Sequence, residues 1–376
     1  MKRRKTLFPI LLIFLISISC KNEPLLDNDL LAGTVRVLDR SIPFPFLLER
    51  TGESIHLLNY KNELIDSTSE HREQYEPMDT IKMRDHQFVV IKTSPHLLLF
   101  DISDSLRFPY NSSLYSAQFV KTVQSEEIEL SAFRQNLEEN IFQTEVKSAH
   151  MTTPNRDLKV IKTMDFTEDS LQTIHTYYYK NHLVFAEKEV AGIYIFERKG
   201  KIFFSKAQEP DTPETLYQIS SIKDKSFVLR TFNYNEEIIE RLEISKDPPS
   251  TEKVRAFARC MEGQPGEYYH DNLTFSKGNE YLIRKIGKNA PEASGDGYIT
   301  VHFTINCKGQ MGHLGLEQMD REFESTSFHP NLVKHIITQV MDLKDWPEIK
   351  PGTFYRDIHS FLMFRIKNGK ITDLCP

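Results

Sequence analysis

The stretch over residues 157–244 constrains the fold most, because short apolar runs in it alternate with residues that favour tight turns. The runs have the length of β-strands and occupy residues 175–179, 183–186, 193–196, 202–204, 216–219, 227–232 and 238–244. Turn-forming residues separate the central runs at 180–181, 199–200, 223–224 and 233–235. Six or seven such strands predict an antiparallel meander that closes or curls, since closure protects the edge strands.

The preceding stretch has the same character but contains one interruption. Short apolar runs occur at residues 43–48, 55–58, 88–91 and 97–100. Between residues 126 and 142, apolar side chains recur at near-helical spacing among acidic residues, at Ile128, Phe133, Leu137 and Ile141. We interpret this segment as an amphipathic helix with a solvated acidic face. The sequence therefore predicts a β-rich domain over 32–155 that includes the helix, and a second β-rich meander or barrel over 156–247.

The residues after 251 predict a different architecture. Residues 247–251 contain two consecutive prolines, Pro248 and Pro249, which break regular structure and mark a domain boundary. Beyond them, apolar residues alternate over 299–305 as in a strand with one buried face, and recur over 332–341 at helical spacing. Asn368-Gly369 is a typical hairpin turn. We expect a small sheet packed on a helix over 254–376, and a mainly β fold with an α+β C-terminal domain overall.

The N-terminus has the pattern of an export signal. Basic residues at 2–5 precede an apolar run over 7–19 that ends in Ser19-Cys20. The run is about thirteen residues, whereas a membrane-spanning helix needs roughly twenty, so an uncleaved anchor is the less favoured reading. We expect a lipoprotein signal peptide over 1–19, a lipid-modified Cys20 and a polar tether over 20–31. Lys21 resembles the residue found in lipoproteins sent on to the outer membrane, where the chain would face the periplasm or the cell surface.

Charge and motifs exclude several function classes. The formal net charge is −6 and falls to −10 without residues 1–19, which hold four basic residues and no acid, so nucleic acid is not an expected partner. The chain has no Gly-x-Ser-x-Gly, Cys-x-x-Cys, His-Glu-x-x-His or glycine-rich phosphate loop. His270 and Asp271 are adjacent, and neighbours on a strand point to opposite faces, so they make a poor metal site. We therefore expect no enzymatic activity, no cofactor and no metal, although a cleft that gathers His or carboxylate side chains from distant segments would favour an enzyme instead.

Two regions resemble known families. The β-rich units resemble the small lipocalin-like barrels of Bacteroidetes-type envelope lipoproteins, in the first unit through Ile42-Pro43-Phe44-Pro45-Phe46 and residues 104–110. Residues 297–309, the helix that ends near Trp346, and residues 364–371 resemble the TonB C-terminal domain family. That resemblance implies docking of a partner protein on a strand edge, with contacts at Phe364, Ile366 and Ile371. It does not extend to energy transduction, because the chain has a lipidation signal and no proline-rich spacer.

Three cysteines remain once Cys20 carries lipid: Cys260, Cys307 and Cys375. In an oxidising compartment, one disulfide and one free thiol is the natural outcome, although all three could stay reduced. Loop-closure entropy does not choose between the pairs. Cysteines at positions matching Cys260 and Cys307 occur in the TonB-like variant that this region resembles, and the resemblance therefore implies a Cys260–Cys307 bond.

The combined expectation is a lipid-anchored, non-catalytic cell-envelope protein that docks a partner protein through its C-terminal domain. The alternative is a lipocalin-like carrier of a small apolar ligand. A carrier needs an apolar cavity of a few hundred Å³, whereas a packed barrel leaves no room. The consecutive Tyr177, Tyr178 and Tyr179 could line such a cavity, but ordinary packing explains them equally well.

Overall fold

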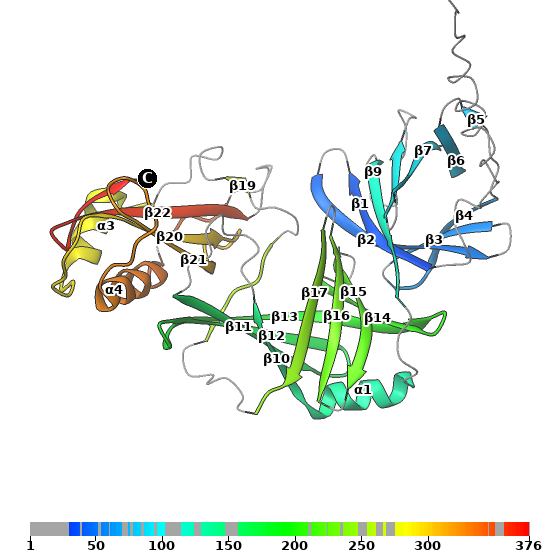
Figure 1. Cartoon of the computed structure of the whole chain (residues 1–376), viewed down its shortest axis with the longest axis horizontal. Coiled ribbons are helices and arrows are strands. Elements are labelled where there is room, and N and C mark those ends of the chain that lie inside the picture. The colour runs from blue at the N-terminus through cyan, green and yellow to red at the C-terminus, as the bar shows by residue number, and fades with distance from the viewer. Residues whose placement is uncertain are drawn as a thin grey trace, which may run out of the picture.

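The computed structural model describes residues 30–37, 40–51, 54–59, 61–69, 74–75, 78–83, 86–93, 96–101, 114–123, 129–146, 157–209, 212–223, 225–233, 236–246, 254–260, 266–267, 275–344, 346–349 and 357–375. The expected signal peptide, Cys20, Pro248-Pro249 and residues 268–271 lie outside them. Over the described residues the fold is mainly β, with three sheets and an α+β C-terminal unit (Figure 1). This confirms the fold class expected from the sequence.

The first sheet contains nine strands and uses residues 30–121. Its pairing order is β4-β3-β2-β1-β9-β8-β7-β6-β5, and β1 joins the two halves by pairing antiparallel with β2 and β9. The strands are β1 (Leu30–Val37), β2 (Arg40–Thr51), β3 (Ser54–Leu58), β4 (Leu64–Ser69), β5 (Gln74–Tyr75), β6 (Met78–Met83), β7 (His86–Thr93), β8 (His96–Asp101) and β9 (Leu114–Lys121). β4 approaches β6 from the other half of the order, so the sheet curls on itself. The expected tether over 20–31 overlaps the start of β1.

The second sheet is an eight-stranded antiparallel barrel, lipocalin-like in form. Each strand pairs with its neighbours in sequence, and β17 closes the barrel by pairing with β10. The strands are β10 (Ile141–Val146), β11 (Leu158–Phe166), β12 (Ser170–Tyr179), β13 (His182–Arg198), β14 (Lys201–Glu209), β15 (Thr212–Lys223), β16 (Ser226–Asn233) and β17 (Glu236–Ile244). Two of the expected turns, Lys180-Asn181 and Lys199-Gly200, have positive φ at both residues, as two-residue hairpin turns require.

Helix α1 (Leu130–Glu139) belongs to this barrel. Its expected place in the first β-rich domain is wrong. Phe133 and Leu137 are buried in the barrel core together with Phe142 of β10, so the helix closes one end of the barrel. The division expected at 155/156 therefore lies between β9 and α1 instead. The reason is that the apolar face of the helix packs against strands that follow it in sequence.

Aromatic rings fill the barrel next to α1. Phe142 and Phe227 lie 4.7 Å apart between ring centroids, and Phe204 stacks on Tyr217 at 4.4 Å. Phe166 meets Phe204 edge to face at 5.8 Å. These spacings are those of close-packed aromatic pairs. The part of the barrel core that the structure describes is therefore occupied by side chains.

The C-terminal unit packs two helices on a five-stranded sheet. Its elements are β19 (Gly266–Glu267), α3 (Gly278–Gly287), β20 (Gly297–Ile305), β21 (Met311–Met319), α4 (Pro330–Met341), β22 (Ile358–Lys367) and β23 (Lys370–Cys375). The sheet order is β19-β22-β20-β21, and β23 pairs with β22. Six apolar side chains of α4 are buried, and Trp346 packs on Phe303 and Phe275 as a core anchor. Helix α3 was not expected from the sequence.

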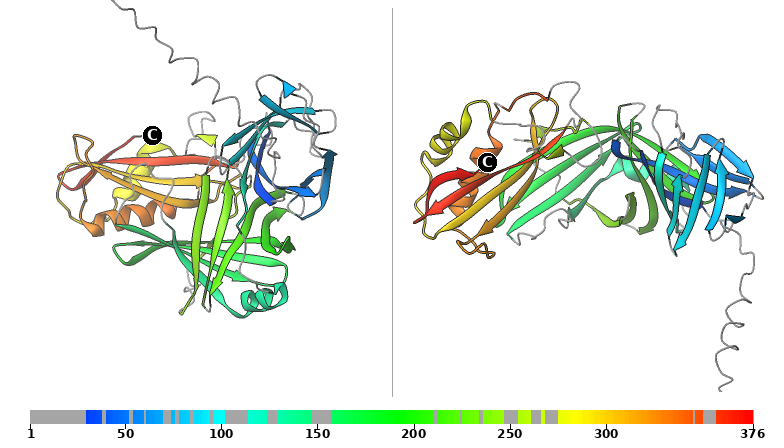
Figure 2. Two further views of the ribbon diagram at one scale, coloured as in Figure 1. Left: turned by 45° about the vertical axis from the view of Figure 1, so that its right-hand side comes forward. Right: turned by 90° about the horizontal axis from the view of Figure 1, so that it is seen from above.

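The barrel lies between the other two units and shares buried residues with each (Figure 2). Leu47 of the first sheet packs with Phe203 of the barrel. On the other side, Tyr177 and Phe185 belong to the buried cluster of the C-terminal unit. A short strand, β18 (Arg255–Ala256), pairs in parallel with β13 and carries the chain across this second junction. The two units on either side of the boundary expected at residues 247–251 therefore share buried residues.

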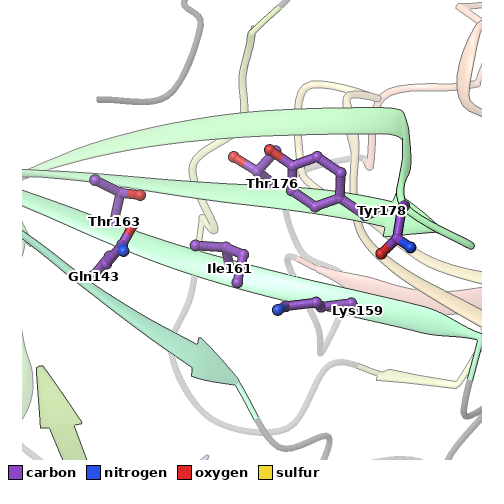
Figure 3. A pocket seen from close by; sticks show the side chains of 7 residues that line it. Gln143, Lys159, Ile161, Thr163, Thr176 and Tyr178 are labelled. Atoms are coloured by element: carbon purple, nitrogen blue, oxygen red, sulfur yellow. The ribbon is translucent and has the colours of Figure 1, made fainter. Parts of the chain in front are cut away.

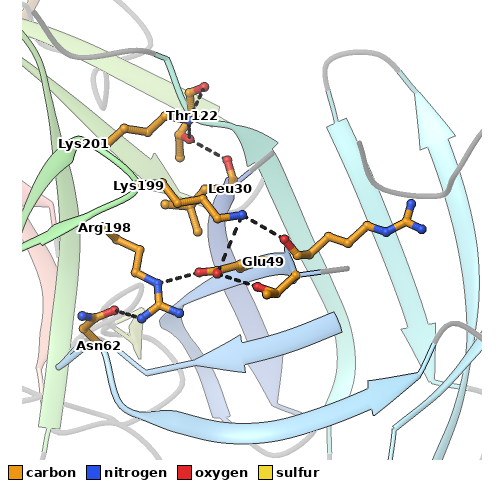
Figure 4. A network of polar contacts seen from close by, with 9 residues as sticks. Leu30, Glu49, Asn62, Thr122, Arg198, Lys199 and Lys201 are labelled. Carbon is orange, nitrogen blue, oxygen red and sulfur yellow. Dashed lines mark hydrogen bonds and ion pairs between the residues drawn. The ribbon is translucent and has the colours of Figure 1, made fainter. Parts of the chain in front are cut away.

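A polar network also joins the first sheet to the barrel (Figure 4). Glu49 is 4% exposed and accepts hydrogen bonds from Arg198 Nε at 2.5 Å and Thr51 Oγ1 at 2.8 Å. Burial raises the pKa of the Glu49 carboxyl, but the hydrogen bonds outweigh it and the pKa is lowered. Lys201 Nζ donates to Thr122 Oγ1 at 2.6 Å. The carboxylate therefore stays ionised at this junction.

Among the described residues, no helix is long and apolar enough to cross a membrane.

Candidate functional site

The inner face of the barrel changes from apolar to charged along its strands. Met164 of β11 lies in the core near α1, and Lys162 points to the same face because alternate residues of a strand share a face. Lys162 Nζ lies 2.8 Å from Glu240 Oε2, and Lys206 Nζ lies 2.6 Å from Glu189 Oε2. The part of the inner face beyond the packed core is therefore a band of paired charges.

Glu187 lies at the end of this band, where the barrel meets the C-terminal unit. Its side chain is almost fully buried; Oε1 accepts a hydrogen bond from Tyr177 Oη at 2.8 Å, and Oε2 accepts one from the backbone N–H of His313 at 2.9 Å. A Cβ added to Gly312 would come within 2.4 Å of Oε2, so a glycine is needed beside the carboxyl. Burial raises the pKa of Glu187 to about 7. The carboxyl clamps the barrel to β21.

His175 faces the same band from β12. Its Nδ1 lies 3.8 Å from Glu187 Oε1. Burial lowers the pKa of His175 to about 4, and the nearby ammonium groups of Lys162 and Lys206 lower it further against the opposing carboxylate of Glu189. At neutral pH the imidazole is therefore uncharged, and the contact with Glu187 is not an ion pair.

A pocket of about 290 Å³ lies on the outer face of β10, β11 and β12 (Figure 3). Thr163 lines it and points away from Met164, which faces the barrel core. The full lining is Gln143, Lys159, Ile161, Thr163, Thr176, Tyr178 and Asn181. The three consecutive tyrosines thus divide: Tyr177 and Tyr179 are packed in the core shared with the C-terminal unit, and Tyr178 borders the pocket.

The outer edge of β21 in the C-terminal sheet is covered. Glu187 accepts from the His313 N–H, Gln318 Nε2 lies 3.4 Å from Tyr179 Oη, and Ser325 forms a β-bridge with Met319. The opposite side of the sheet ends in β23, which pairs with β22 along one edge. We call the other edge of Lys370–Cys375 the β23 edge; no described strand pairs with it.

The partner contacts expected at Phe364, Ile366 and Ile371 need correction. Phe364 and Ile366 are almost fully buried, and Ile371 packs against the same core. Phe364 and Ile366 lie under the helices because β22 is an inner strand of the sheet whose apolar face is covered, and Ile371 of β23 points to the same covered face. A partner on this sheet would have to meet its edge instead.

Exposed cations gather around the β23 edge. The hairpin of β22 and β23 presents Arg365, Lys367 and Lys370; α3, which packs beside β23, adds Arg284, and Lys288 follows α3. The acids on these elements are Glu280 and Asp373, and Asp296 accepts a hydrogen bond from the N–H of Asn368 in the hairpin turn. This end of an otherwise acidic chain is therefore positively charged.

The disulfide joins Cys260 to Cys307, the pair that the family resemblance implied. The Cys260 N–H donates to both carboxylate oxygens of Asp357, at 2.9 and 3.1 Å, and Asn306 Nδ2 donates to the Ala258 carbonyl at 2.8 Å. The segment after β18 is thereby fastened to the C-terminal sheet. The side chain of Cys375 is outside the described residues.

The described residues contain no cluster of three His, Cys, Asp or Glu side chains arranged for a metal ion. His175 and Glu187 were not predicted as functional residues from the sequence. A signal was present, because Lys162, His175 and Glu187 occupy inward-facing positions of amphipathic strands. Using that signal required the strand register, which the sequence alone did not fix.

No protein-family model matches this sequence, and the search of curated proteins found no match.

Proposed function

We propose that this chain is a lipid-anchored, non-catalytic protein of the cell envelope that docks a partner protein on the β23 edge. The observation that carries this proposal is the difference between the two sides of the C-terminal sheet. Barrel side chains and Ser325 cover β21, whereas β23 has a partner on one edge only. A strand edge with unpaired backbone groups is the surface that β-augmentation uses.

The charge around the edge defines the partner. Arg365, Lys367 and Lys370 are exposed, and Arg365 lies opposite Asp373 in the β22–β23 register, so Lys367 and Lys370 are the cations without an acid across the hairpin. An extended segment rich in Asp and Glu would place its carboxylates near these cations while its backbone adds a strand to β23. Such complementarity increases association rate and selects partners. The occupant we propose is therefore an acidic, extended segment of another envelope protein.

The non-catalytic part of the proposal rests on Glu187. Its pKa of about 7 would suit a general base, but a base must reach a substrate proton. Glu187 is 2% exposed, and both of its oxygens accept hydrogen bonds that hold the barrel to β21. These contacts support a structural role for the carboxyl.

The barrel form also supports a carrier function, the alternative from the sequence. The aromatic packing of Phe142, Phe204 and Phe227 leaves the described core next to α1 filled, which weighs against an apolar ligand held there. The docking proposal therefore has the stronger geometric support.

Lipid anchoring predicts a defined response to one substitution. Cys20→Ser should abolish labelling by a radioactive fatty acid and prevent processing after Ser19, because the thiol that carries the lipid is gone. Labelling and membrane partitioning of cells that express each form measure the effect, with Cys375→Ser as the matched control. Undiminished labelling of the Cys20→Ser form would refute lipid attachment at this residue.

Docking on the β23 edge predicts a charge-dependent cross-link. A photo-crosslinking amino acid at the exposed Thr372 should give one adduct in cells, and Lys367→Glu with Lys370→Glu should reduce its yield about tenfold, since close interfacial charges couple by more than 1.4 kcal/mol. Lys223→Glu, at an exposed position on barrel strand β15, is the control and should leave the yield unchanged. An adduct equally sensitive to Lys223→Glu, or insensitive to charge at 367 and 370, would contradict docking here.

A further inference from the structure

We infer that the pocket on the outer face of β10, β11 and β12 binds a small neutral polyhydroxylated ligand, such as one sugar unit of an envelope glycan. The pocket has a volume of about 290 Å³, at the lower end of the range of roughly 300–1,000 Å³ that small-molecule sites occupy. It is separate from the β23 edge, so the inference stands independently of the docking proposal.

Thr176 provides the observation that points to a ligand. Its side chain is 4% exposed, it lines the pocket, and its Oγ1 has no hydrogen-bond partner among the described residues. A buried hydroxyl without a partner is costly, and buried polar groups are nearly always hydrogen-bonded. A ligand hydroxyl that reached Oγ1 would satisfy it.

The other lining groups define the chemistry of the ligand. Lys159 is already neutralised by Glu145, with Nζ and Oε2 2.9 Å apart, so no uncompensated charge calls for an ion. Gln143 Oε1 accepts a hydrogen bond from Ser245 Oγ at 3.0 Å, so the Nε2 group of the same amide points away from Ser245. Together with the Asn181 amide and the Thr163 hydroxyl, these groups offer both donors and acceptors. That combination suits a neutral molecule with several hydroxyl groups.

Tyr178 adds an apolar surface. It is half-buried and lies on the same face of β12 as Thr176, so both residues border the same pocket (Figure 3). The C–H face of a sugar ring is apolar and packs on aromatic rings, whereas its rim of hydroxyls needs polar partners. A ring beside amides and hydroxyls matches both sides of such a ligand.

Ligand-observed NMR tests the inference with defined probes. The full-length mature protein is titrated with the methyl glycosides of glucose, galactose, mannose and N-acetylglucosamine, and separately with inorganic phosphate. We expect saturation transfer to at least one glycoside, and no broadening of the phosphorus signal of inorganic phosphate. Binding of phosphate alone, or of no glycoside, would overturn the inference.

Matched variants assign any binding to this pocket. Thr176→Val and Tyr178→Ala should each weaken the Kd for the bound glycoside about tenfold, the effect of losing one hydrogen bond or ring contact. Thr300→Val, which changes another buried hydroxyl without a partner, and Tyr194→Ala, at an exposed tyrosine of β13, should leave the Kd unchanged.

Melting temperatures separate loss of binding from loss of folding. Thr176→Val should melt no lower than the unmodified protein, because a methyl group replaces a hydroxyl that lacks a partner among the described residues. At one glycoside concentration, the Tm of the unmodified protein and of the two control variants should rise more than that of the two pocket variants. Unchanged affinity in both pocket variants, or equal loss in the two controls, would show that the pocket is not the site.

Discussion

Replacing both Cys260 and Cys307 with serine is expected to lower the free energy of unfolding by about 4 kcal/mol. The bond closes a loop of 47 residues, and in the chain-entropy model a cross-link of this length stabilises the folded state by that amount. Denaturant unfolding of the two forms, both produced in an oxidising compartment, measures the difference. A loss of about 4 kcal/mol is a large fraction of the unfolding free energy of an ordinary domain.

The control for this prediction is Cys375→Ser, which leaves the Cys260–Cys307 bond intact and should change the unfolding free energy far less. Peptide mapping of the non-reduced protein should recover the two bonded cysteines in one linked fragment. Equal stability of the double-serine form and the unmodified protein, or a linkage to Cys375, would contradict the assignment.

We expect a second large effect from His175 and Glu187. Their pKa values are shifted in opposite directions, so their contributions to the free energy of unfolding change with pH in opposite directions. Glu187 has its pKa raised from 4.5 to about 7, so its contribution to stability is present at low pH and lost as pH rises through this range. His175 has its pKa lowered from 6.5 to about 4, so its contribution is present above pH 6.5 and lost as pH falls. Between pH 4.5 and 6.5 the two trends have opposite signs.

Single substitutions should separate these trends. Relative to the unmodified protein, Glu187→Gln should be most destabilising near pH 4.5 and less so as pH rises to 7, a change of up to about 3 kcal/mol. His175→Gln should show the reverse dependence, with a smaller amplitude because His175 keeps 24% of its side chain exposed. Urea unfolding at pH 4.5, 5.5, 6.5 and 7.5 measures both, and a shared direction of change in the two variants would refute the interpretation.

The local features of this fold were predictable from sequence because each is determined by neighbouring residues. Lys180-Asn181 and Asn368-Gly369 adopt the positive φ angles that hairpin turns need, and the alternation over 299–305 gives the strand β20. The position of α4 follows from its apolar spacing in the same way.

Features that depend on distant residues were not predictable in this way. The apolar face of helix α1 could pack on the sheet before it or on the sheet after it. The structure places Phe133 in the barrel core, on the sheet after it. The burial of Phe364 follows from the place of β22 inside the sheet, which no spacing rule reveals. Glu187 acquires its role from His313, 126 residues later in the chain. The burial and the contacts of such residues depend on the register of long-range strand pairing, which sequence periodicity specifies only weakly.

Strand β13 has a mechanical consequence for a chain with these proposed attachments. Its 17 residues span about 55 Å at about 3.3 Å per residue, with Phe185 in the C-terminal core at one end and Phe196 against the first sheet at the other. Tension between a partner at the β23 edge and a lipid at Cys20 would run largely along this one covalent backbone. Its neighbours β12 and β14 would then be loaded in shear, where many ladder hydrogen bonds must break together, and the barrel should resist extension better than a sheet that is peeled strand by strand.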